Sequence, residues 1–106
     1  MDEIDERRDK ERKWCKWEVN WSHFNQGGNF KGHILNFSQE GSYLETAQPI
    51  ILGTTVLIRV LQCTDFRGEY PKDLRFNTFA EVKWCRELNI SEGACYGVGL
   101  RYHFPV

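Results

Sequence analysis

The clearest pattern in the chain is a strict alternation of apolar and polar residues between positions 15 and 22. The apolar residues of this stretch, with one polar residue after each, are Cys15, Trp17, Val19 and Trp21. A repeat of two residues is typical of a β-strand that has one face in the core and the other in water. Turn residues follow at positions 25–28, Asn-Gln-Gly-Gly, and end the pattern. The sequence therefore predicts a strand over residues 15–22.

Five further stretches, rich in β-branched, aromatic and aliphatic residues, have the length of strands. We expect these strands at residues 30–37, 42–46, 54–60, 76–88 and 96–104. They are linked by turns over residues 38–41 and 91–93, a connection over residues 49–53 and a loop over residues 64–74. No stretch has the pattern of a long helix. Short strands with hairpin-sized connections predict an all-β fold, either a sandwich or a small barrel, and a closed barrel would have no exposed strand edges.

The start of the chain has a different character, because residues 2–13 are almost entirely charged. Pairs such as Glu3 and Arg7 stand four residues apart and would support a surface helix. Without an apolar stripe to dock it, however, so short a helix is marginally stable in water. We therefore predict a flexible arm over residues 1–13 and one compact domain over residues 14–106, as the length of the chain allows.

The charge and hydropathy of the chain narrow the classes of function. The net charge of −1 argues against binding to a nucleic-acid polymer, since neutralising phosphates requires an excess of basic residues. No apolar run approaches the roughly 20 residues that cross a bilayer. The acidic first residues also lack the basic and apolar regions of a signal peptide. We expect a cytoplasmic protein that does not insert into membranes.

Neither a metal site nor an active site is indicated. The four cysteines have no C-x-x-C spacing and the three histidines are scattered, so we expect reduced thiols, no metal and no cofactor. The chain also lacks a nucleophile elbow, an H-E-x-x-H motif and a P-loop. The sequence therefore predicts a binding protein and not an enzyme.

Two short motifs contain the candidate ligand-binding residues. The first is R-x-x-x-R on the arm, formed by Arg8 and Arg12 and preceded by Arg7. The second is N-x-S-x-x-G at a predicted turn, and its defining residues are Asn36, Ser38 and Gly41. Each motif alone is common, because charged arms often contain such arginine pairs and because Asn, Ser and Gly are ordinary turn residues.

In this order the two motifs resemble the signature of the PilZ family, which is R-x-x-x-R followed by D/N-x-S-x-x-G. Further stretches that look like strands of this family lie at residues 35–38, 41–44, 53–58, 80–84 and 96–102. The resemblance covers residues 7–104, nearly the whole chain. It implies a six-stranded antiparallel β-barrel with a flexible N-terminal arm and little or no helix. It also implies a bacterial receptor for the second messenger cyclic di-GMP.

The chemistry of the two motifs suits this ligand independently of the family. Cyclic di-GMP has two phosphates and two guanines, and an arginine fork makes paired hydrogen bonds with phosphate oxygens or with the O6/N7 edge of guanine. Asn36 and Ser38 offer short polar groups for a base edge. Gly41 would either let the backbone approach closely or adopt a positive φ. Charge-assisted hydrogen bonds of roughly 1.5–3 kcal/mol each would offset the cost of ordering the arm over the ligand.

The resemblance also implies roles for single residues. The two motif arginines are expected to bind guanine and phosphate, while Asn36 and Ser38 contact the other guanine from the barrel surface. Arg7 is expected to reach a second, intercalated ligand molecule. Trp84 lies on a predicted strand, where its ring would stack on a base.

The predicted function is that of a receptor whose arm changes conformation on binding cyclic di-GMP and that passes the signal to a downstream protein partner. One alternative is a PilZ-like adaptor that binds another protein through its β surface and does not bind the ligand. A second alternative is a small barrel that binds single-stranded nucleic acid through its tryptophans, which the net charge disfavours.

Overall fold

The computed structural model describes residues 13–64, 77–88 and 95–103 of the chain. Residues 1–12 of the predicted arm, nearly all of the predicted loop 64–74 and the predicted turn 91–93 lie outside this part. The described residues form six strands, which are β1 (Lys13–His23), β2 (Phe30–Phe37), β3 (Gly41–Thr46), β4 (Thr55–Thr64), β5 (Asn77–Glu87) and β6 (Tyr96–Tyr102).

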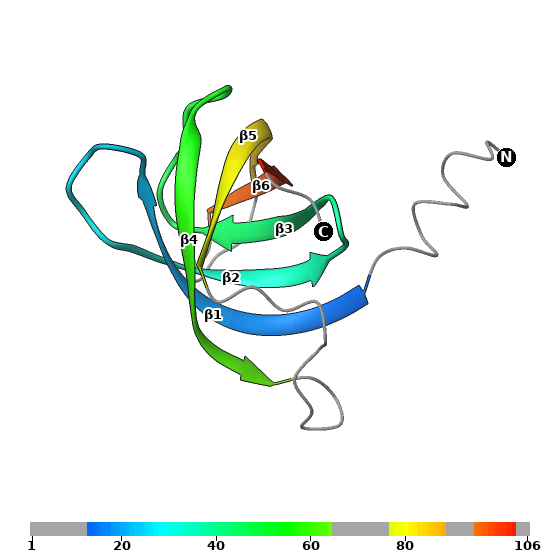
Figure 1. Ribbon diagram of the computed structural model, residues 1–106. Coiled ribbons are helices and arrows are strands. Elements are labelled where there is room, and N and C mark those ends of the chain that lie inside the picture. The colour runs from blue at the N-terminus through cyan, green and yellow to red at the C-terminus, as the bar shows by residue number, and fades with distance from the viewer. Residues whose placement is uncertain (1–12, 65–76, 89–94, 104–106) are drawn as a thin grey trace, which may run out of the picture.

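The six strands close into an antiparallel barrel, which confirms the predicted fold. Around the barrel the strands follow the order β1-β2-β3-β6-β5-β4, and β4 pairs with β1 to complete the circle. Figure 1 shows the strands curving around a common interior. Strands that follow each other in the sequence are neighbours except at the crossing from β3 to β4, so that β3 pairs with β6. Each described strand therefore has a partner on both sides.

The apolar positions of the alternating pattern fill the interior of the barrel. In β1 the side chains of Trp17, Val19 and Trp21 are 1–3% exposed, whereas those of Lys16 and Glu18 face water. The other strands contribute further buried apolar residues, among them Ile34, Phe37, Leu44, Val56, Ile58, Ala80, Val82, Val98 and Leu100. The pleat of the strands thus sends alternate side chains inward, and in β1 this is the alternation that the sequence predicts.

Several strands end at other residues than predicted, because the neighbouring strand decides how far pairing continues. β4 extends to Thr64, beyond the predicted end at position 60. This extension pairs with β1, where Thr64 lies opposite Lys16. β1 itself begins at Lys13, earlier than the predicted start at position 15, and β6 ends at Tyr102. The alternation within a segment does not show where its partner stops.

Irregular pairing curves β1 around the barrel. Its ladder with β2 shifts register between Trp14 and Trp17, and its ladder with β4 shifts between Glu18 and Val19. A bulge of this kind bends a strand and increases its twist. β1 can therefore pair with β2 along one edge and with β4 along the other, which closes the barrel.

A buried chain of hydrogen bonds joins β1, β2 and β3. The indole N–H of Trp21 donates to the hydroxyl of Thr46 at 2.9 Å, and that hydroxyl donates to the carbonyl oxygen of Lys31 at 2.7 Å. The side chains of Trp21 and Thr46 are both almost fully buried. Since a buried N–H without an acceptor is costly, Thr46 makes a tryptophan acceptable at this core position.

β3 and β6 approach each other closely at Gly41, which pairs with Arg101. A Cβ atom on Gly41 would overlap the carbonyl oxygen of Leu100 and lie 3.0 Å from its carbonyl carbon. The φ of Gly41 is not in the positive region, where Gly28 and Gly53 lie. Of the two predicted reasons for this glycine, close approach of the backbone is therefore the one that applies.

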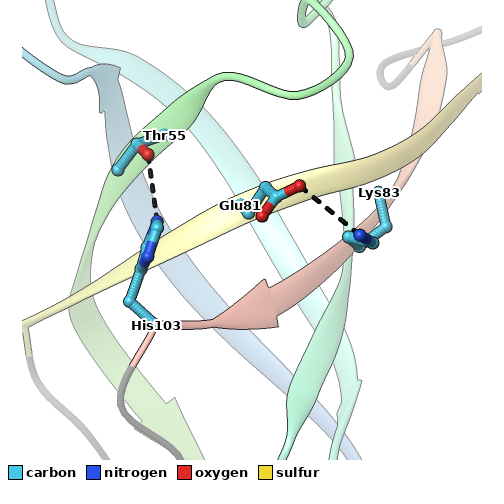
Figure 2. Close-up of polar contacts among 4 residues, drawn as sticks. All are labelled: Thr55, Glu81, Lys83 and His103. Carbon is cyan, nitrogen blue, oxygen red and sulfur yellow. Dashed lines mark hydrogen bonds and ion pairs between the residues drawn. The ribbon is translucent and has the colours of Figure 1, made fainter.

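Two polar contacts lie on the surface formed by β4, β5 and the residue after β6 (Figure 2). The hydroxyl of Thr55 and Nε2 of His103 are 2.9 Å apart and join the start of β4 to the end of β6. On β5, Nζ of Lys83 lies 3.4 Å from Oε2 of Glu81. Both charged side chains remain exposed, so this ion pair contributes little to stability.

Three cysteines of the described part are thiols, namely Cys15, Cys85 and Cys95. The thiol of Cys15 donates to the carbonyl oxygen of Ile34 at 3.4 Å. Within the described ranges, nothing helical has the length and apolar character of a membrane span.

The hydroxyl of Thr46 is expected to stabilise the barrel. Thr46→Val keeps the shape of the side chain but leaves the indole N–H of Trp21 without its acceptor. We expect the free energy of unfolding, measured by urea denaturation, to fall by about 1–3 kcal/mol. Thr78→Val is the control, because among the described residues the Thr78 hydroxyl makes one long, exposed contact of 3.5 Å, and it should cost less than about 0.5 kcal/mol. Equal stability of the two variants would contradict the role of Thr46.

Gly41→Ala tests the close approach of β3 and β6. The added methyl group would meet the backbone of Leu100, so the two strands must separate. We expect a loss of about 3 kcal/mol in unfolding free energy, the upper end of ordinary overpacking. Gly27→Ala is the control, since a Cβ there would have no heavy atom within 4 Å, and it should leave the melting temperature unchanged. A Gly41→Ala variant that melts like the wild type would show that β6 moves aside without cost.

Candidate functional site

The register between β1 and β2 brings the start of the barrel next to the N-x-S-x-x-G turn. β1 begins at Lys13, directly after Arg12, and Lys13 lies opposite Phe37. The next residue, Trp14, lies opposite Asn36. The predicted ligand-binding residues Arg7, Arg8 and Arg12 are outside the described residues. The chain therefore enters β1 beside the second motif, although 24 positions separate Arg12 from Asn36 in the sequence.

Ser38 holds the turn of the second motif together. Its backbone N–H donates to the carbonyl oxygen of Gly41 at 2.8 Å. Its side-chain oxygen accepts hydrogen bonds from the backbone N–H groups of Glu40 at 3.2 Å and Gly41 at 3.3 Å. These local bonds are typical of serine at a turn. The hydroxyl hydrogen takes no part in either bond, so Ser38 can stabilise the turn and still donate to a ligand.

Asn36 lies on the outer face of the barrel but is covered. It pairs with Trp14 of β1 and with Tyr43 of β3, and residues opposite each other in a sheet project from the same face. Trp14 is 69% exposed, which identifies this face as the outer one, yet Asn36 is only 6% exposed. The resemblance implies that Asn36 contacts a guanine from the barrel surface, and the structure leaves only a small part of this residue accessible. A ligand would therefore reach only part of its amide.

Trp84 lies further around the outer surface of the barrel, on β5. It lies opposite Gly99 of β6, which in turn lies opposite Tyr43 of β3. Its side chain is 39% exposed, so one part of the indole is available for contact. The guanidinium carbon of Arg86 is 5.2 Å from the centre of the ring, within the range of a cation–π contact.

A continuous row of paired residues thus crosses five of the six strands. This outer row consists of Trp14, Asn36, Tyr43, Gly99 and Trp84, on β1, β2, β3, β6 and β5 in that order. Neighbouring strands are about 4.8 Å apart, so Asn36 and Trp84 are separated by three such steps around the barrel. Two of the predicted ligand-binding residues therefore belong to one row on the outer surface, half of the circuit of six strands apart, and β4 contributes no residue to this row.

The aromatic rings of Tyr43 and Trp84 meet above β6. Their centroids are 5.7 Å apart and their planes differ by 28°. A Cβ atom at Gly97 would lie 2.6 Å from the hydroxyl oxygen of Tyr43, and one at Gly99 would overlap the indole of Trp84. The two glycines of β6 therefore leave its outer face bare, and the rings cover it.

The hydroxyl of Tyr43 stays uncharged well above neutral pH. It donates to Oε2 of Glu45 at 2.8 Å. Burial raises the pKa of Tyr43 to about 12, and the hydrogen bond to Glu45 and its negative charge act in the same direction, whereas Arg86 opposes them. Ionisation would place a phenolate beside a carboxylate, which explains the direction of the pKa shift.

Sequence reasoning missed Tyr43, Glu45 and Arg86 as members of this face. One available signal was the spacing of Gly97 and Gly99, because two glycines two residues apart in a strand leave one face without side chains. The contact between Tyr43 and Trp84, however, depends on β6 lying between β3 and β5, which the order of the sequence does not reveal.

The chemistry on the outer row is that of binding. The exposed indole of Trp84 can stack on a base, and the neighbouring guanidinium of Arg86 and hydroxyl of Ser38, which lie outside the row, can donate hydrogen bonds. In the part of the chain that the structure describes, no group of three or more His, Cys, Asp or Glu side chains is arranged to hold a metal ion.

Comparison with known proteins agrees with the motifs and the barrel. The sequence matches the family model described as the PilZ domain over residues 6–105. A search of curated proteins finds no match. Because the matched span covers nearly the whole chain of 106 residues and contains both motifs, this chain belongs to the PilZ domain family.

Proposed function

We propose that this chain is a receptor for cyclic di-GMP that binds its ligand between the N-terminal arm and the outer row of the barrel. Membership of the family implies a cyclic di-GMP-binding domain in general, and PilZ domains are binding domains and not catalytic ones. For this chain, we extend that general property to specific binding residues and to transmission of the signal.

The observation that carries the proposal is the register of β1 and β2. Lys13 pairs with Phe37, so the residue that follows the R-x-x-x-R motif is adjacent to the N-x-S-x-x-G turn. A ligand bound at the turn would then be within reach of a short arm carrying Arg8 and Arg12. Effective concentration rises when two binding groups are joined by a short connection.

The proposed binding residues have different roles because their side chains differ in charge and shape. Arginine forks bind phosphate or the O6/N7 edge of guanine, so Arg8 and Arg12 supply most of the affinity and Arg7 contacts a second ligand molecule. Ser38 and the accessible part of Asn36 contact one guanine, and the exposed part of Trp84 stacks on a base. Gly41 supports the turn by allowing β6 to approach.

Signalling is the second part of the proposal. We infer that the arm becomes ordered over the ligand and that a downstream protein partner binds the ordered form, in the cytoplasm of a bacterial cell. A segment that folds on binding suits a switch, because its ordering cost is incurred only when the ligand is present.

An adaptor function without ligand is the second candidate, and one observation favours it. Phe24 and Phe79 are 53% and 37% exposed, and their rings meet edge to face at 5.6 Å away from the outer row. Exposed apolar clusters often mark protein contacts. Calorimetric titration with cyclic di-GMP separates the two functions, because an adaptor of this kind does not bind this ligand.

Calorimetric titration should detect cyclic di-GMP binding in the micromolar range or tighter. GTP and cyclic GMP should bind far more weakly, since a single guanine cannot occupy the arm, the turn and Trp84 together. Equal affinity for GTP would contradict the proposed mode of binding, and no heat with any nucleotide would favour the adaptor.

Arg8→Ala and Arg12→Ala should each weaken binding on the order of a hundredfold, equivalent to about 3 kcal/mol, through the loss of two charge-assisted hydrogen bonds. The melting temperature should hardly change, because surface substitutions cost within about 0.5 kcal/mol. Arg59→Ala is the matched control: this exposed arginine lies on β4, the strand that contributes nothing to the outer row, and its loss should not affect binding. If Arg12→Ala unfolds the domain or binds like the wild type, the arm is not a ligand clamp.

A further inference from the structure

Tyr43 and Trp84 come from strands that are not neighbours. β6 lies between β3 and β5, and the two rings reach each other across it because Gly97 and Gly99 have no side chains. The rings lie 5.7 Å apart at an angle of 28°, an offset arrangement that aromatic pairs favour. The indole of Trp84 therefore has a fixed neighbour on the outer face of the barrel.

Tyr43 is itself held in place. Its hydroxyl donates to Glu45 at 2.8 Å on the same face of β3, and its ring covers Gly97 of β6. The groups that face the Tyr43 hydroxyl are the carboxylate of Glu45 and the guanidinium of Arg86, and the pKa of about 12 keeps the hydroxyl protonated at any pH used for binding. Tyr43 thus acts as a rigid, uncharged support.

Trp84, in contrast, would be mobile without this support. Its side chain is 39% exposed and its pairing partner on β6 is Gly99, so no Cβ atom at that position confines the ring. A side chain that is ordered only on binding reduces affinity, whereas one that is already ordered does not.

We propose that Tyr43 is a positioning residue that holds the indole of Trp84 in the orientation in which it stacks on a guanine base. This inference rests on the proposed function, since it assumes that Trp84 contacts the ligand. Tyr43 acts through Trp84 and makes no contact of its own with the base. Arg86, over the same indole, adds a second restraint from β5.

The test compares variants that remove the ring of Tyr43, remove only its hydroxyl, or displace the ring. Tyr43→Leu removes the ring and should weaken cyclic di-GMP binding about three- to tenfold, the factor that corresponds to freeing one side chain. Tyr43→Phe keeps the ring and should bind within about twofold of the wild type. Gly97→Ala displaces the tyrosine ring and should resemble Tyr43→Leu, whereas Gly27→Ala, which meets no atom within 4 Å, should bind normally. Melting temperatures of all variants separate weakened binding from loss of fold.

A double-mutant cycle with Trp84→Ala decides whether Tyr43 acts through the indole. Contacting residues that work as a unit have non-additive effects, so Tyr43→Leu should cause no further loss of affinity when Trp84 is absent. An equal loss in both backgrounds, or no loss in the wild-type background, would overturn the proposal.

The near-ultraviolet circular dichroism of the protein without ligand keeps this inference separate from the proposed function. Tyr43→Leu should reduce the long-wavelength tryptophan bands, to which tyrosine does not contribute, and this reduction should be missing in the Trp84→Ala background. If the wild type does not bind cyclic di-GMP, the proposed function fails, and this spectrum alone decides whether Tyr43 orders Trp84. If Tyr43→Leu leaves the spectrum unchanged, the positioning role is wrong even when the ligand binds.

Discussion

Closure of the barrel through β1 is the constraint on which the rest of the structure depends. β1 pairs with β2 along one edge and with β4 along the other, and two irregularities in its ladders supply the curvature that this double pairing requires. The same strand fills much of the interior, where Trp17 packs on Phe37 and Trp21 on Phe30. Because both edges of β1 are committed, its register cannot slip without exposing this aromatic core.

That fixed register also assembles the candidate site. The position of Lys13 opposite Phe37 is a consequence of core packing further along β1, and it is what joins the end of the arginine motif to the N-x-S-x-x-G turn. Ser38 then defines the shape of the turn by accepting two backbone hydrogen bonds, and Gly41 allows β6 to close in behind it. Asn36 and Trp84 are thus held by strands, which position side chains more precisely than loops do.

The aromatic contact over the outer face of β6 depends on the absence of side chains from that strand. Gly97 and Gly99 leave the strand bare, and Tyr43 and Trp84 approach from either side to cover it. Inside the barrel, inward residues must be apolar or, like Thr46, hydrogen-bonded, so variation is limited. Outside, the only requirement is compatibility with water, and the aromatic pair over β6 is therefore a feature that the fold permits but does not demand.

The sequence alone determined the number of strands, the inward face of β1 and the two motifs, because alternation and turn residues are local properties. It also led from the motifs to the family and to the residues of the arm, whose roles stay predictions. Only the tertiary structure decided that β4 continues to Thr64, that Asn36 is buried although it pairs with the exposed Trp14, and that Gly41 serves close approach and not a positive φ. The physical reason is common to all three, because each depends on which strand lies alongside and in which register it pairs. In a barrel, closure of the sheet sets these neighbouring strands and registers. No local pattern of residues encodes that closure.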